Sequence, residues 1–213
     1  MAQERGRPRT FDIDDALEQA LRVFWKRGFL DASLAELTEA MGLNKPSLYA
    51  AFGDKEQLYL RALERYVEQR LSRQAVALES EPEAPRAIER FLRGLAALYT
   101  DPRNPGGCFI VNGTADLGGA GMPAAVEARL REALQANEAR LKSRLQRARA
   151  DGQLAADAQP DQLASFYMAT VAGLGVLAKA GARRARLDAV VDQAMRAWPA
   201  LTPRRARQTR PSR

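Results

Sequence analysis

The stretch GLNKPSLYAAFGDK, residues 42–55, decides the fold and lies between two strongly helical segments. Its middle suits a short helix, because Pro46 falls in the first turn, where N–H groups have no intrahelical partner. A helix of two turns is not stable alone in water, since nucleation is unfavourable and few hydrogen bonds follow it. Neighbouring helices must therefore hold it, and we expect a helix, a tight turn and a second, short helix packed together.

Capping and turn residues predict the boundaries around this stretch. Apolar residues recur at spacings of three and four from Asp12 onward, and Gly28 supplies a stop. Ser33 and Glu36 match a capping box, which marks the start of the next helix. The helices predicted for this first part are 12–27, 33–41, 44–52 and 55–78.

Helical patterns continue beyond the Pro- and Glu-rich stretch 79–85, and no alternating pattern of a strand competes with them. The further predicted helices are 85–100, 107–118, 122–150, 160–180 and 184–198. The sequence thus predicts an all-α fold with an N-terminal three-helix helix-turn-helix domain and a larger helical bundle. The expected divisions are 1–54 for DNA binding, 55–200 for effector binding and dimerisation, and 201–213 as a basic tail.

Composition restricts the classes of function. The 213 residues include no histidine and one cysteine, Cys108. Without histidine the chain lacks the usual general base and the commonest metal ligand, so we expect no enzyme, no metal and no cofactor. A lone thiol and the absence of a long apolar run predict a cytoplasmic protein with no membrane partner. An all-α enzyme with Cys108 as nucleophile is the less favoured alternative.

The net charge of +7 does not by itself indicate nucleic acid binding. Residues 181–213 hold nine arginines and two aspartates, which account for the whole excess. A DNA-binding hypothesis must therefore rest on local motifs, and the short helix at 44–52 is one that fits a major groove.

The outer face of this short helix carries the expected DNA contacts. Leu48 and Phe52 lie four apart and should pack inward. Outside them, a lysine suits a guanine edge or a phosphate, a proline ring suits a thymine methyl, and a tyrosine hydroxyl suits a phosphate. The residues expected to contact double-stranded DNA here are Lys45, Pro46, Ser47 and Tyr49, with Ser33 before them and Lys55 at the next helix N-terminus.

An arginine-rich segment precedes the first helix. In RGRPR, residues 5–9, Arg5, Arg7 and Arg9 alternate with glycine and proline. Such an extended arm can lie in a narrow minor groove, and a solvated leader is the equal alternative. Arginine arms also leave open an architectural protein that coats DNA.

These motifs also resemble a known family. The run TEAMGLNKPSLYAAFGDKEQL, after ALEQALRVFWKRGFLDASLAEL, is similar to the DNA-binding region of TetR-type transcriptional repressors over residues 7–66. Residues 86–200 resemble the family's second half less sharply. The resemblance implies an Ω-shaped homodimer that binds DNA through its feet, an effector pocket in each larger domain, and release of DNA when the effector binds. A two-fold dimer would read a palindromic operator.

The larger domain offers a dimer surface and a pocket. Small and apolar residues interleave over 160–180, so this helix and the last one can pair with their copies in a four-helix interface. Burial within one subunit is the alternative. Aromatic side chains should line an apolar effector pocket, and they are Phe91, Tyr99, Phe109, Phe166 and Tyr167.

Cys108 follows two glycines where a helix is expected to begin. A thiol at a helix N-terminus is more nucleophilic, so it could sense oxidants or electrophiles. A buried structural cysteine is the alternative, slightly favoured by the residues alone. The effector is accordingly expected to be a small molecule or a thiol-reactive compound.

Overall fold

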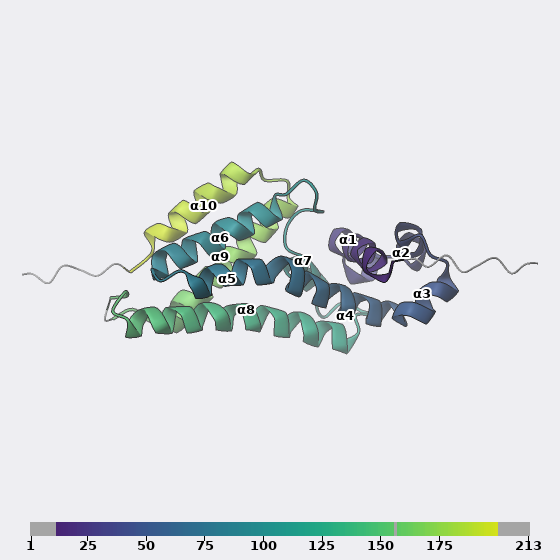
Figure 1. Cartoon of the computed structure of the whole chain (residues 1–213), viewed down its shortest axis with the longest axis horizontal. Helices are drawn as coiled ribbons and strands as arrows, with labels where there is room; N and C mark the ends of the chain where they lie inside the picture. Colours follow the sequence, from purple (N-terminus) through teal and green to yellow (C-terminus); the bar gives the residue numbers. More distant parts are fainter. Residues whose placement is uncertain (1–11, 156, 200–213) are drawn as a thin grey trace, which may run out of the picture.

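The computed structural model describes residues 12–155 and 157–199, and every regular element in these ranges is helical (Figure 1). The all-α prediction is confirmed. The elements in chain order are α1 (Ile13–Asp31), α2 (Leu34–Met41), α3 (Lys45–Phe52), α4 (Lys55–Tyr66), η1 (Val67–Leu71), α5 (Ser72–Ser80), α6 (Ala84–Tyr99), α7 (Phe109–Gly113), η2 (Thr114–Asp116), α8 (Ala124–Ala150), α9 (Pro160–Lys179) and α10 (Arg184–Arg196).

Helix α1 does not end at Gly28, as the sequence predicted. Gly28 adopts a φ of 83°, which kinks the helix, and a further turn then runs to Asp31. The kink frees two N–H groups, and the Asp116 carboxylate accepts hydrogen bonds from Phe29 N at 3.0 Å and Leu30 N at 3.5 Å. The extra turn thus depends on a residue distant in sequence, which no local pattern could indicate.

A continuous connector of α4, η1 and α5 runs from the three N-terminal helices into the larger helical part (Figure 1). Over Val67–Leu71 its hydrogen bonding widens to a π-helix, then returns to an α-helix. The sequence predicted an uninterrupted helix over 55–78, because so local a change in hydrogen-bond register leaves the apolar pattern almost unaltered. Single π turns within α-helices occur frequently at functional sites.

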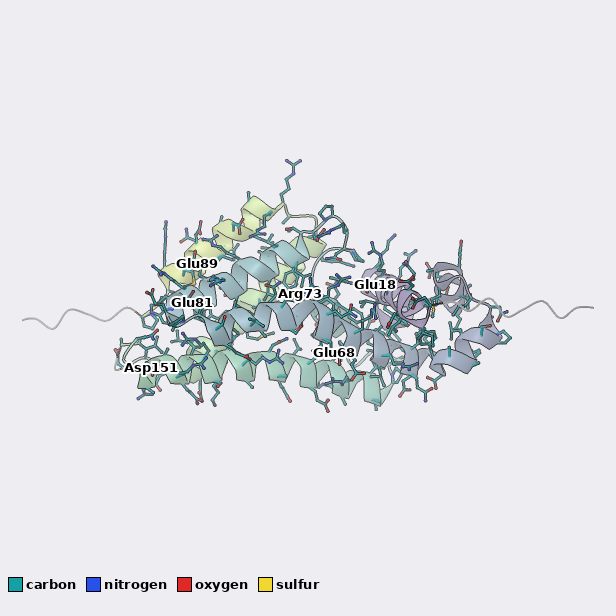
Figure 2. All side chains as sticks on the ribbon, in the orientation of Figure 1. Glu18, Glu68, Arg73, Glu81, Glu89 and Asp151 are labelled. Carbon is teal, nitrogen blue, oxygen red and sulfur yellow. The ribbon has the colours of Figure 1, made fainter. Side chains whose placement is uncertain are left out.

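Ion pairs fix the connector to α1. Arg65 bonds Asp14 at 3.0 Å and Glu18 at 3.1 Å, while Arg70 bonds Glu18 at 2.6 Å. Figure 2 shows Glu18 on the α1 side of this junction. Glu18 and Arg65 are both mostly buried, so these pairs are less screened by solvent than the surface pairs of the molecule.

The hydrophobic core is continuous across the predicted domain boundary at residue 54. Trp25 of α1 meets Tyr66 of the connector at a ring-centroid distance of 4.8 Å. Tyr59 lies 5.2 Å from Phe109 of α7 and 5.0 Å from Phe24 of α1. Aromatic rings from α1, α4 and α7 therefore form one cluster. Because Phe109 of α7 packs against Trp25 of α1, a displacement of α7 would also displace the side chains of α1.

The larger part is a helical bundle in which α6 packs on α5, α9 and α10, and α8 packs on α9 (Figure 1). Helix α7 is much shorter than the predicted helix over 107–118. Gly106 and Gly107 have φ of 88° and 72° and Cys108 is extended, so the helix begins only at Phe109. After Gly113 the chain tightens to a 3₁₀ turn.

Within the described ranges, no helix combines the length and the apolar character that crossing a membrane requires.

Candidate nucleic-acid interface and effector cavity

Helix α3 is held by a cap at its start and by its inner face. Asn44 Oδ1 accepts a hydrogen bond from Ser47 N at 2.8 Å, and Pro46 lies in the first turn. Leu48 and Phe52 are buried, which confirms that this face packs inward. The helix therefore owes its stability to its neighbours and presents its other face outward.

The outward face of α3 carries most of the expected DNA contacts. Lys45 and Pro46 are exposed, Ser47 is half-buried, and the Tyr49 side chain is 47% exposed. Much of the Tyr49 side chain is therefore available for contact with a partner. A lysine, a proline ring and a phenol thus stand together on one short, outward-facing helix.

Ser33 lies at the N-terminus of α2 and forms the predicted capping box. Its Oγ accepts from Glu36 N at 3.1 Å, and Glu36 Oε2 accepts from Ser33 N at 3.3 Å. The backbone hydrogen bond from Ser33 lowers the pKa of the Glu36 carboxyl, and Arg27 adds to this. The capped helix end is exposed, where backbone N–H groups suit a phosphate.

The ammonium group of Lys55, which is predicted to contact DNA, makes two contacts within the chain. Its Nζ donates to Leu30 O at 3.3 Å and lies 4.6 Å from the centre of the Phe29 ring. Burial lowers the pKa of Lys55, against an opposing effect of Asp116. The ammonium group is drawn inward because the extra turn of α1 offers it a free carbonyl and an aromatic face.

The predicted minor-groove arm, with Arg5, Arg7 and Arg9, lies outside the described residues. Within the described residues, no group of three or more histidine, cysteine, aspartate or glutamate side chains is placed to hold a metal ion.

A small, mostly apolar cavity lies inside the larger part, with walls from η1, α5, α6, α7, α8 and α9. We call it the effector cavity; its volume is about 10 Å³, the room of one water molecule. Phe91, Tyr99 and Cys108 line it, as does the amide side chain of Asn137. In this conformation, a larger ligand can enter only if the walls move apart.

Three of the predicted pocket aromatics do not line this cavity. Phe109 turns toward α1 and α4, where it contacts Trp25, Tyr59 and Tyr66. Phe166 is 42% exposed on the surface of α9, because helical spacing places it on the opposite side from the cavity-lining Met168 and Val171. Tyr167 is fully buried in the core, and its hydroxyl finds no partner among the described atoms.

Cys108 is buried, with 3% exposure, and precedes the short helix α7. The Tyr66 hydroxyl donates to its Sγ at 3.5 Å. Burial raises the pKa of Tyr66 and of Tyr99 well above the ordinary value, and Cys108 adds to both shifts. Gly175 of α9 approaches so closely that an added Cβ would lie 3.2 Å from Cys108 Cβ, as expected where small residues permit close packing.

Contacts that the sequence did not reveal join α7, η2 and α9 to α1. Asn112 Nδ2 donates to Trp25 O at 3.4 Å, and Asp116 binds the turn after Gly28. Lys179 Nζ donates to Trp25 O and to Lys26 O, at 3.3 and 3.0 Å. These three side chains lie at or near helix ends, where no sequence pattern indicates a distant partner. Only the tertiary structure therefore identifies their contacts with α1.

Both parts of the chain are similar to known protein families. Residues 16–62 match the family model for bacterial regulatory proteins of the tetR family, and residues 84–198 match a tetracyclin repressor-like C-terminal domain. The chain is 32% identical over 200 residues to the HTH-type transcriptional repressor ComR of Escherichia coli K12, covering 93% of this chain and 94% of ComR. It is 35% identical over 108 residues to the HTH-type transcriptional repressor BdcR of the same organism, about half of each chain.

Among solved structures, a cysteine mutant of the TetR family transcriptional regulator CifR, complexed with 26-base-pair double-strand operator DNA, is similar at 43% identity and a TM-score of 0.85. The match covers 91% of this chain and 100% of that one. Family models thus match both halves of the chain, and the structural match extends over nearly all of it. The chain therefore belongs to the TetR family of DNA-binding transcription regulators.

Proposed function

We propose that the protein is a cytoplasmic, homodimeric repressor that binds a palindromic operator and leaves it when an effector enters the larger domain, and that it is not an enzyme. The observation that carries the proposal is the outward face of α3. There Lys45, Pro46 and Tyr49 are exposed on a helix whose other face is buried. The relatives named as repressors and the operator complex of CifR support the same proposal.

The DNA contacts follow from the chemistry of each side chain. Lys45 reaches a guanine edge or a phosphate, the Pro46 ring meets a thymine methyl, and the Tyr49 hydroxyl donates to a phosphate. Ser47 and Ser33 lie where two helices begin, so their hydroxyls and the nearby backbone N–H groups suit phosphates. The arm with Arg5, Arg7 and Arg9 adds minor-groove contacts.

The effector cavity explains how binding would release DNA. Because the cavity holds about 10 Å³, an effector must push its walls outward. Those walls include Leu71 of the connector and Val111 of α7. The neighbouring Asn112 bonds α1, so opening the cavity moves the support of the DNA-binding helices. The effector thereby shifts the balance between two conformations of one unit.

Cys108 offers a second way to trigger the same movement. A thiol-reactive compound that reached the cavity would add bulk at a position packed against Gly175 and beside Tyr66. Cys108→Ser keeps the volume and removes the chemistry. If the effector is thiol-reactive, this variant should bind the operator and stay bound after alkylation, and if the effector binds reversibly, the variant should respond like the parent.

The homodimer is expected to form through the exposed face of α9 together with α10. Phe166 and Val176 are 42% and 58% exposed, and Ala169 and Gly173 are exposed between them. An apolar stripe with small residues at its centre permits close approach of a second copy. The cavity-lining face of the same helix stays within the subunit.

Footprinting on the DNA that flanks the protein's own gene tests the proposal. A repressor of this kind should protect one discrete site with two-fold symmetry. Uniform protection along the whole fragment would instead favour the architectural, DNA-coating alternative, and protection of one asymmetric half-site by a monomer would contradict the dimer. Turnover of an electrophile by purified protein would support the cysteine enzyme instead.

A further inference from the structure

A second space adjoins the effector cavity between α5 and α8. It has a volume of about 120 Å³, and we call it the arginine hollow because Arg140, Arg144 and Arg147 line it on the α8 side. Ala75 of α5 lines both the arginine hollow and the effector cavity. The apolar cavity and the basic hollow therefore meet at one small side chain.

The arginine hollow is strongly basic. Its three arginines recur at helical spacing, so they share one face of α8, and Glu79 is the acidic residue that lines the hollow with them. Among the ion pairs of the described residues, none involves Arg140, Arg144 or Arg147. Three guanidinium groups thus gather without a bound carboxylate from this part of the chain.

Arg144 is the centre of the cluster. It is buried, with 3% exposure, and its Nη2 donates to Glu81 O and Pro82 O, each at 3.0 Å. Its Nε and Nη1 atoms are buried and have no hydrogen-bond partner among the described residues. A buried charged donor without an acceptor is costly, and an anion bound beside it would remove that cost.

The nearby carboxylates do not meet this need. Glu81 is held by Arg90 at 3.0 Å, and Figure 2 shows Glu81 and Asp151 at the end of the molecule remote from α1. Burial lowers the pKa of Arg144, and Arg147 adds to this, while Asp151 and Glu81 oppose it. The guanidinium group is thus desolvated and only partly compensated.

The two spaces together have the shape of an amphipathic site. Along α8, Asn137 lines the effector cavity and Arg144 lines the arginine hollow, two helical turns or about 10 Å further on. Along the connector, Leu71 and Ala75 line the cavity, and Leu78 lines the hollow. The α8 wall thus becomes basic from the cavity to the hollow, whereas the connector wall stays apolar as far as Leu78 and then adds Glu79.

We propose that the effector is an amphipathic organic anion, with its apolar body in the effector cavity and its anionic head in the arginine hollow. This inference rests on the proposed function, because it names the chemical class of the effector. Charge-assisted hydrogen bonds from guanidinium groups select a carboxylate, sulfate or phosphate head. A neutral analogue of the same length lacks that anchor.

Calorimetric titration with octanoate and octan-1-ol tests the inference on the full-length protein. Octanoate should bind at least about 10-fold more tightly than octan-1-ol, as expected for one charge-assisted hydrogen bond. Arg140→Glu and Arg144→Met should each weaken octanoate by about 10-fold or more and leave octan-1-ol unchanged. Arg140 is exposed, so its variant keeps the test valid if loss of Arg144 disturbs the turn at Pro82.

Arg149→Glu is the matched control for Arg140→Glu, because Arg149 is exposed on the same helix but lines neither space. It should bind octanoate like the parent. Equal affinity for octanoate and octan-1-ol, no measurable octanoate binding, or unchanged octanoate binding by Arg140→Glu would each overturn the inference.

Operator release, measured separately by fluorescence anisotropy, distinguishes this inference from the proposed function. Arginine-dependent binding of octanoate without operator release would support the anion site and contradict effector-driven release. Release by a neutral compound that persists in Arg140→Glu would support the proposed function and overturn the anion site.

Discussion

The buried tyrosine hydroxyls of this molecule differ in whether they have a hydrogen-bond partner. Tyr66 donates its hydroxyl to Cys108, whereas the hydroxyls of Tyr59 and Tyr167 have no partner among the described atoms. Burial alone raises the pKa of Tyr167 to about 12. A phenol in such a place contributes its ring to packing, and its oxygen opposes folding.

Tyr167→Phe should therefore stabilise the fold. The ring remains, while a desolvated hydroxyl without an acceptor is removed, so the free energy of unfolding should rise by about 1 kcal/mol. Urea unfolding followed by circular dichroism measures it. Tyr66→Phe is the control and should not stabilise, since its hydroxyl has the thiol as partner; a loss of stability in Tyr167→Phe would show that the hydroxyl is hydrogen-bonded.

Tyr49→Phe tests an exposed tyrosine, on the outward face of α3. Tyr49 is 47% exposed, so losing its hydroxyl should leave the fold intact. The lost hydrogen bond to a phosphate should weaken operator binding by about 1.5–3 kcal/mol. Gel shift on the footprinted site, with unfolding as a check of the fold, measures the effect, and an unchanged affinity would remove Tyr49 from the interface.

At the scale of elements, the junction of α1, α7 and the connector depends on the kink at Gly28 and on the Asp116 carboxylate. Gly28 has φ 83° and ψ −177°, a conformation essentially restricted to glycine, and an added Cβ would lie 2.6 Å from Asp116 Oδ2. The Asp116 carboxylate occupies that space and binds the next N–H group. The kink and the carboxylate are thus one joint between the DNA-binding helices and the effector cavity.

Asp116→Ala should weaken this joint. Removing the carboxylate leaves Phe29 N without its acceptor, so the free energy of unfolding should fall by about 1–3 kcal/mol. Operator affinity should fall as well, because the last turn of α1 loses its support. Chemical unfolding and gel shift check both. Glu64→Ala, at an exposed position of α4, is the matched control; equal stability of the two variants would contradict the joint.

The sequence predicted those elements whose signals are local. The capping box of Ser33 with Glu36 and the cap at Asn44 are short-range hydrogen bonds, and both occur as expected. The extra turn of α1 was missed because its cap is Asp116. Lys55 is expected to contact DNA because a lysine at a helix start suits phosphate, and its hydrogen bond to that same turn could not be predicted from local sequence.

In the larger helical part, too, the sequence did not predict which residues line the cavity. Aromatic residues are easy to list from sequence, but which of them line a cavity depends on helix rotation. Phe91 lies on the side of α6 that lines the cavity, whereas Phe166 lies on the exposed side of α9. The arginine hollow was missed for the same reason, because spaced arginines on a helix usually indicate a solvated face.

At the scale of the whole molecule, buried tyrosines make stability depend on alkaline pH. Burial raises the pKa of Tyr59, Tyr66, Tyr99 and Tyr167 above the ordinary 10.0. Above that pH, the unfolded chain loses these protons while the folded chain keeps them, so stability must fall as pH rises.

Each buried phenol should contribute a slope of about 1.4 kcal/mol per pH unit between its unfolded and folded pKa. For Tyr167 this window runs from 10.0 to about 12. Urea unfolding at a series of pH values measures the slope, and Tyr167→Phe should reduce it by one such contribution. Stability that stays constant over this window would show that the phenols ionise in the folded state.

The proposed dimer would form through the exposed face of α9, where Gly173 offers a selective test of it. A Cβ built at Gly173 meets no atom within 4 Å in the single chain, so a long side chain fits there without strain. Glycine inside a helix also has poor helix propensity, and Gly173→Arg should improve the intrinsic stability of α9 by about 1 kcal/mol. In a dimer, the same side chain would hold the two apolar stripes apart and bury a charge between them.

Gly173→Arg should therefore be a folded monomer with weakened operator binding, because a monomer presents only one α3 to the palindrome. Light scattering gives the mass, circular dichroism the fold, and gel shift the affinity. Gly173→Ala adds only a methyl group and should stay dimeric, as should Ala128→Arg, which places the same charge on the exposed surface of α8. If Gly173→Arg dimerised as tightly as these controls, the two-fold contact would have to lie on another face, and the spacing of the two α3 helices would change with it.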